Sequence, residues 1–144
     1  MAPNTIAYID IRVFSHATED ENKVIEAVRK ILSTDQLQEV VFEKHKLRGH
    51  HGNLITFFET RIKNKETLKA IAENLSAHFN TLDKEELRPR ISEFTEKGSL
   101  YVRLDKQAAF EGEFKLAQVD PIRIRVRFKK EDITQICQEL GIIP

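Results

Sequence analysis

The sequence contains one cysteine, Cys137, and no tryptophan. A single cysteine excludes an internal disulfide and any zinc site built from several thiolates, which favours a reducing, intracellular environment. No apolar run approaches the roughly 20 residues that span a bilayer, and the first residues lack the apolar segment of a secretory signal peptide. We therefore expect a cytoplasmic protein with no membrane segment.

The chain also lacks net charge, because 23 basic residues balance 23 acidic ones. A neutral total removes the simplest sequence argument for binding a polyanion, which is a basic overall balance. The 40% of hydrophobic residues excludes a disordered chain, and 144 residues suit one domain with its own core. We expect a single domain over residues 1–144, in which any nucleic-acid surface arises from local segregation of charge.

Hydrophobic periodicity predicts the secondary structure. Alternating or clustered apolar residues indicate strands over 6–14, 38–45, 54–63, 100–105 and 122–128. Apolar stripes at helical spacing predict helices over 18–32, 64–80, 83–96 and 131–140. Thr18 and Glu21 have the spacing of a capping box, Pro89 should break the third helix, and Gly141 should end the last one. The order β-α-β-β-α-(α)-β-β-α predicts an α+β two-layer sandwich, a mostly antiparallel sheet with helices packed on one face.

A basic strand is the first candidate binding feature. Residues 121–130 contain five basic side chains and no acidic one. Arg123, Arg125 and Arg127 alternate along the predicted strand, so they project from one face about 6 to 7 Å apart. The planar guanidinium group binds phosphate bidentately and stacks on bases, which makes this strand a candidate RNA contact.

Other strands are expected to extend this face. If the strands share one sheet, the outward positions add Tyr8, Arg12, Tyr101 and Arg103. Arginines interleaved with aromatic rings form a stacking platform for single-stranded bases. Two other interpretations remain open here: a solvated face whose arginines pair with carboxylates on neighbouring strands, such as Asp10 or Glu59, and a dimer interface.

The segment 44–53 is the second candidate. It combines two glycines with seven residues that can contact phosphates: Lys44, His45, Lys46, Arg48, His50, His51 and Asn53. Glycine lets a ligand approach the main-chain N–H groups, while the cations and histidines supply charge and hydrogen bonds. A metal site on these histidines is disfavoured because no local carboxylate or thiol completes it, and general acid–base catalysis by His50 and His51 is a further alternative to a solvated turn.

Three segments resemble an archaeal family of predicted RNA-binding proteins that is often described as associated with the exosome. They are the turn Gly49-His50-His51-Gly52-Asn53, the opening YIDIRVFSHATEDENKVIEAV, and LYVRLDKQAA from Leu100 to Ala109. The resemblance extends from about residue 4 to the last helix. It implies an antiparallel sheet covered by helices, as in the ribosomal protein fold that binds five-S RNA, and it adds Lys106 and Gln107 as candidate RNA contacts. His51 stands where this family commonly has tyrosine, and the turn lacks the family's proline.

The sequence therefore predicts a non-catalytic RNA-binding protein without cofactor or metal. The resemblance implies a role in RNA processing or exosome-type degradation, with RNA and proteins of that machinery as partners. The first alternative is a protein-interaction or dimerisation module that uses the same sheet face. The second is a ribonuclease that uses the turn histidines.

Overall fold

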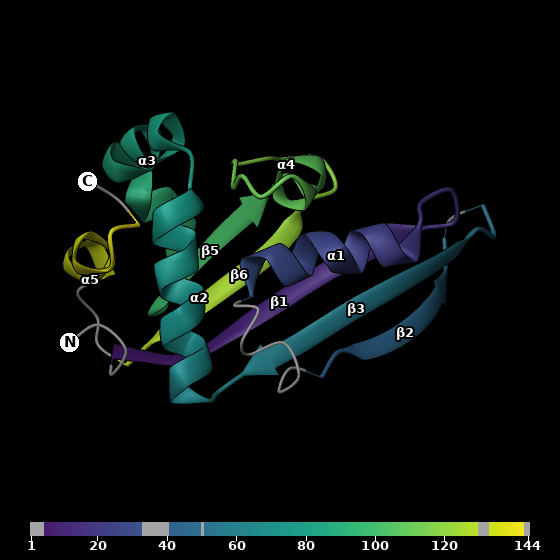
Figure 1. The fold of residues 1–144 in the computed structure, drawn as a ribbon, viewed down its shortest axis with the longest axis horizontal. Helices are drawn as coiled ribbons and strands as arrows, with labels where there is room; N and C mark the ends of the chain where they lie inside the picture. The colour runs from purple at the N-terminus through teal and green to yellow at the C-terminus, as the bar shows by residue number, and fades with distance from the viewer. Residues whose placement is uncertain (1–4, 33–40, 50, 130–132, 143–144) are drawn as a thin grey trace.

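One sheet organises the described part of the chain, which in this computed structural model comprises residues 5–32, 41–49, 51–129 and 133–142 (Figure 1). Its strands are β1 (Ile6–His16), β2 (Glu43–Arg48), β3 (Leu54–Ile62), β4 (Thr95–Glu96), β5 (Ser99–Leu104) and β6 (Ile122–Phe128). Their order is β2-β3-β1-β6-β5-β4, and each neighbouring pair is antiparallel. The first and last strands of the chain are therefore central neighbours.

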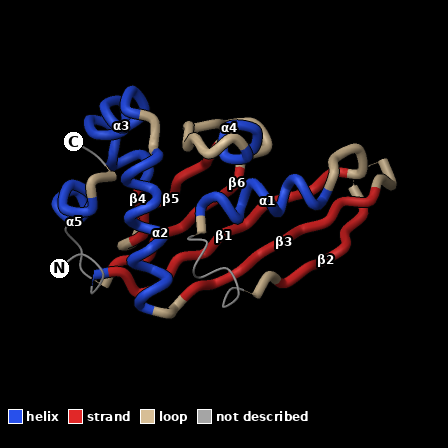
Figure 2. The backbone as a smooth tube through the Cα atoms, viewed as in Figure 1, coloured by secondary structure: helices blue, strands red, loops and turns tan. Residues whose placement is uncertain are grey.

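The helices form a second layer on one face of this sheet (Figures 1 and 2). They are α1 (Glu21–Ile31), α2 (Lys65–His78), α3 (Thr81–Leu87), the 3₁₀ helix η3 (Arg88–Phe94), α4 (Lys106–Phe110) and α5 (Ile133–Leu140). The core lies between the layers, where Ile9 and Ile11 of β1 and Ile124 of β6 pack in one buried cluster with Val28 of α1 and Ile71 of α2. The predicted α+β sandwich with helices on one face is confirmed, and no helix of the described residues is long and apolar enough to cross a membrane.

Local chemistry explains the helix boundaries. Asp20, not the expected Thr18, caps α1, since its side chain accepts a hydrogen bond from the Asn22 N–H at 2.9 Å. Pro89 divides the third predicted helix as expected: α3 ends at Leu87, and Arg90 has non-helical angles (φ −110°, ψ 16°) within η3. Gly141, at φ 76°, follows the end of α5 as predicted.

The strand predicted over 38–45 is displaced, other predicted bounds differ from the structure by one to three residues, and two short elements were not predicted. The strand expected over 38–45 is observed as β2, Glu43–Arg48, while 38–40 lie outside the described residues. This edge strand is exposed throughout and is ordered by pairing with β3, so apolar alternation does not reveal it. The expected start of the last helix, at 131–132, also lies outside the described part. Only two residues form β4 and five form α4, too few to show a periodicity.

Candidate nucleic-acid interface

The sheet face opposite the helices carries the predicted basic strand. We call it the open face. Its side chains alternate with the core residues. They include Tyr8, Asp10, Arg12, Phe14, His45, Phe57, Glu59, Arg61, Tyr101, Arg103, Arg123, Arg125 and Arg127, with His16, Glu43, Leu47 and Ile55 toward the β2–β3 edge and Glu96 and Ser99 at the β4–β5 edge. The structure thus brings the arginines of β6 together with Arg103, and it places Tyr8, Arg12 and Tyr101 beside them as expected.

Three arginines lie side by side at the middle of this face. Arg123 of β6 is directly opposite Arg12 of β1 on one side and Arg103 of β5 on the other. We call these three residues the arginine row. Like charges directly opposite one another on antiparallel strands destabilise a sheet, so folding alone gives no reason for this arrangement.

The carboxylates of the open face do not neutralise the β6 arginines. Asp10, with a side chain only 7% exposed, receives two hydrogen bonds from Arg61, at 2.7 and 3.0 Å. This pairing raises the pKa of Arg61 above its ordinary value, so the guanidinium remains charged. Glu59 lies 3.6 Å from Arg12 and 3.4 Å from the His45 ring. Both acids suggested by the sequence as partners are thus engaged elsewhere.

Four arginines of the open face consequently have no acidic partner among the described residues. They are Arg103, Arg123, Arg125 and Arg127. Arg125 donates to the Ser99 hydroxyl at 3.1 Å, and Arg127 donates to the main-chain carbonyl of Lys97. Their charges therefore remain available to an anion.

Aromatic rings border the arginine row on both sides. On one side Arg125 lies between two tyrosines, its guanidinium carbon 5.7 Å from the Tyr8 ring centre and 5.5 Å from that of Tyr101. On the other side Arg123 lies 5.7 Å from the ring of Phe14, which packs 4.9 Å from Phe57. Such alternation of cations and rings is the composition of a base-stacking surface.

Phe57 lies on the open face although it directly precedes the core residue Phe58. It is half-buried on the open face, because Phe58 occupies the inward position of β3 and adjacent residues of a strand face opposite sides. Phe14 and Arg61 were missed as residues of this surface. The alternation of Ile55, Phe57, Glu59 and Arg61 with Thr56, Phe58, Thr60 and Ile62 was the available signal.

A cavity of about 250 Å³ lies over the arginine row. Its lining combines cationic, aromatic, acidic and apolar residues: Asp10, Arg12, Tyr101, Val102, Arg103, Arg123, Ile124 and Arg125. Four of these eight residues are arginines, and the single acid is the one already bound by Arg61. The cavity is therefore cationic.

The second predicted cluster is split between the two sides of β2. His45 faces the open side, with its ring 6.1 Å from that of Phe57. Lys44, Lys46 and Arg48 face the opposite side, where the Lys44 ammonium lies 3.1 Å from Glu21. Hydrogen bonds from Thr56 and Lys44 lower the pKa of Glu21. The segment was interpreted as one turn, but residues 44–48 form a strand. Successive side chains of a strand point to opposite faces, which accounts for this division.

The turn between β2 and β3 is tight and distant from the arginine row. Gly49 N–H donates to the Asn53 carbonyl at 2.6 Å, and Gly52 adopts φ 80°, which favours glycine. His51 and Asn53 are exposed, and His50 lies outside the described residues. Glu59, the partner of Arg12, lies six positions after Asn53, so the turn and the arginine row are about 20 Å apart along β3.

Lys106 and Gln107 lie at the start of α4, where other side chains and the main chain engage their polar groups. The Lys106 side chain is 14% exposed, and its ammonium contacts the Phe14 carbonyl at 2.6 Å, Asp120 at 2.8 Å and Glu19 at 3.1 Å. These acceptors use all three donors of the amine. Gln107 donates to Glu111 at 2.8 Å.

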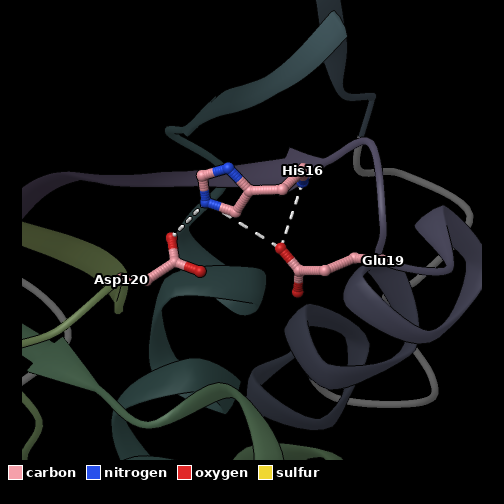
Figure 3. A group of neighbouring side chains, drawn as sticks. All are labelled: His16, Glu19 and Asp120. Atoms are coloured by element: carbon pink, nitrogen blue, oxygen red, sulfur yellow. Dashed lines mark hydrogen bonds and ion pairs between the residues drawn. The ribbon is translucent and has the colours of Figure 1, made fainter. Parts of the chain in front are cut away.

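Figure 3 shows the anionic side of this cluster, in which the His16 ring meets Asp120 at 3.0 Å and Glu19 at 3.9 Å. Burial alone would raise the pKa of Asp120, but hydrogen bonds from Lys106 and His16 lower it, so this carboxylate stays ionised. Two groups of described residues have metal-ligand chemistry, this one and Glu43 with His45 and Glu59. Lys106 already supplies a cation to the first group, and Arg12 lies against Glu59 of the second.

Comparison with known proteins shows the family of the chain. A protein family described as "RNA binding" matches residues 8–128. RNA-binding protein PAB1135 of Pyrococcus abyssi is 34% identical over 139 residues, which cover 91% of this chain and 90% of that protein.

The chain also resembles two solved structures. Protein AF2318 of Archaeoglobus fulgidus has 26% identity and a TM-score of 0.77, covering 94% of this chain and 99% of that one. Mth689 of Methanothermobacter thermautotrophicus, a DUF54 protein, has 27% identity and a TM-score of 0.73, covering 97% and 99%. The chain therefore belongs to this RNA-binding family.

Proposed function

We propose that the protein binds RNA through the open face, centred on the arginine row. The observation that carries the proposal is that Arg103, Arg123, Arg125 and Arg127 have no acidic partner among the described residues, although Arg103 and Arg123 directly oppose like charges. Phosphates would relieve this repulsion, because each guanidinium can donate two parallel hydrogen bonds to one phosphate. The family and the name of the Pyrococcus abyssi relative support RNA as the polyanion.

Bases would contact the rings beside the arginines. Tyr101 is 37% exposed, and Phe14 and Phe57 are half-buried. Stacking of a base on such a ring contributes about 1–3 kcal/mol and tolerates any base. Affinity would then depend on an accessible single strand more than on sequence. Exposed Lys46, Arg48, His51 and Asn53 at the β2–β3 hairpin would provide a second contact for longer RNA.

The proposed role is non-catalytic and cytoplasmic, as an accessory to RNA processing or exosome-type degradation. Catalysis by the turn histidines would need a second acid–base group or a phosphate-stabilising cation within reach. The arginine row is about 20 Å from the turn along β3. The guanidinium groups of this row are therefore out of reach of the turn histidines, and the role we propose for the row is binding.

A salt titration of RNA binding tests this proposal. With four phosphate contacts, log K should fall against log salt with a slope near −3, since each contact on a single strand contributes about −0.7. Replacing Arg103, Arg123 and Arg125 with glutamine should remove about three contacts and flatten the slope to near −1. Arg29→Gln, at an exposed position on α1, is the matched control and should leave the slope unchanged.

Light scattering on the same samples distinguishes the protein-interaction alternative. The RNA proposal is contradicted if the triple variant binds RNA like the wild type. If that variant instead loses a self-association that the wild type shows, the open face is an interface between copies of the chain.

A further inference from the structure

The cavity over the arginine row presents more positive charge at one point than one internal phosphate requires. Arg12, Arg103 and Arg123 are adjacent cross-strand neighbours, and all three line it with Arg125. The one acid in the lining, Asp10, accepts both of its observed hydrogen bonds from Arg61. The lining therefore combines four cations with one carboxylate whose charge is already compensated, and of the four only Arg12 has another acidic neighbour, Glu59 at 3.6 Å.

An internal phosphodiester carries one negative charge, and two of its oxygens are esterified. A terminal phosphate has a charge of about −1.5 to −2 and three unesterified oxygens that accept strong hydrogen bonds. Arg103, Arg123 and Arg125 line the cavity without an acidic partner among the described residues, so each can donate to a different oxygen of such a group. We propose that this cavity binds the terminal phosphate of an RNA strand, an inference that rests on the proposed function.

The walls of the cavity fit the rest of an end nucleotide. Tyr101 forms one side and is exposed enough to stack on a base, while its ring packs 5.5 Å from the Arg125 guanidinium. The volume of about 250 Å³ is below the 300–1,000 Å³ usual for drug-sized ligands. It admits the phosphate and part of one nucleotide, and the remaining strand would leave across the open face.

Fluorescence anisotropy with four short RNAs tests the inference. Three are seven-nucleotide strands of one sequence with a 5′-phosphate, a 3′-phosphate or hydroxyl groups at both ends. The fourth is a nine-nucleotide strand with hydroxyl ends, whose two additional phosphodiesters match the charge of one terminal phosphate. We expect one of the two phosphorylated strands to bind about tenfold more tightly than the charge-matched strand. A tenfold difference in affinity corresponds to about one charge-assisted hydrogen bond.

Variants locate the effect. Arg103→Gln and Arg123→Gln should each reduce the preference for the phosphorylated end at least threefold, while Arg29→Gln should preserve it. Circular dichroism verifies that each variant is folded. Competition with a free nucleoside monophosphate and with inorganic phosphate distinguishes an RNA end from a small phosphate ligand, since the RNA end should compete far better.

The outcomes separate the two proposals. Equal affinity for the phosphorylated and charge-matched strands overturns terminal-phosphate recognition and leaves RNA binding intact. A free monophosphate that competes as well as the RNA end overturns the assignment to RNA. Failure of all four RNAs to bind at low salt contradicts the proposed function itself.

Discussion

Replacing Arg123 with glutamine should make the protein more stable and weaken its binding to RNA. Arg123 directly opposes Arg12 and Arg103, so the substitution removes two cross-strand repulsions at once. A change that increases stability while it reduces binding is expected where a residue is retained for function at the expense of folding.

The magnitude follows from the contacts of Arg123. Each directly opposed pair of like charges costs about 0.2–1 kcal/mol, so removing two yields roughly 0.4–2 kcal/mol. The lost contact with Phe14, at 5.7 Å, offsets about 0.5–1 kcal/mol of this. We expect a net increase of about 0.5 kcal/mol in the free energy of unfolding, or a rise of roughly 1–2 °C in Tm. High salt should abolish the increase, because the Debye length falls to about 3 Å at 1 M.

Arg125→Gln is the matched control on the same strand. Arg125 opposes Asp10 and Tyr101, lies between two tyrosine rings and donates to Ser99. Its loss should lower the free energy of unfolding by about 2 kcal/mol, from two cation–π contacts and one hydrogen bond. Urea unfolding of both variants at low and high salt measures the contrast. A fall of about 1 kcal/mol for Arg123→Gln at low salt would refute the reasoning, since Arg123 would then stabilise the fold.

Four further predictions concern other parts of the molecule. Lys106→Met should lower the free energy of unfolding at neutral pH by about 1–3 kcal/mol in urea, because two carboxylates and a main-chain carbonyl lose their donor. The folded-state pKa of Asp120 is lower than its ordinary value of 3.8, so the stabilisation is complete above that value and is lost as the pH falls through the folded pKa. Thermal unfolding between pH 2 and 7 should show this loss, and Asp120→Asn should reduce it. Burial raises the pKa of the Cys137 thiol to about 12, so a thiol reagent at pH 8 should label it only when the protein unfolds, and rapid labelling of the native protein would contradict this. Gly52→Ala should cost about 1 kcal/mol from its φ of 80° alone, since an added Cβ meets no atom within 4 Å, and binding of short RNA should be unchanged.

The sequence was sufficient for elements that contact the core. Alternation in 122–128 predicted the bounds of β6, and the apolar stripe after Asn64 predicted α2. These segments carry their own pattern because one side of each is excluded from water. Edge strand β2 lacks such a pattern, since all six of its residues are exposed, and its position depends on pairing with β3.

For the candidate site, the sequence by itself determined which arginines share a face of β6, because side-chain direction alternates along any strand. It did not determine what lies opposite them. Strand order and register placed Arg12 and Arg103 beside Arg123. They also paired Asp10 with Arg61 and separated the β2–β3 turn from the arginine row by about 20 Å. The tertiary structure decided these points, because cross-strand neighbours come from segments as distant in the chain as β1 and β6, and a shift of one residue in register would exchange every partner.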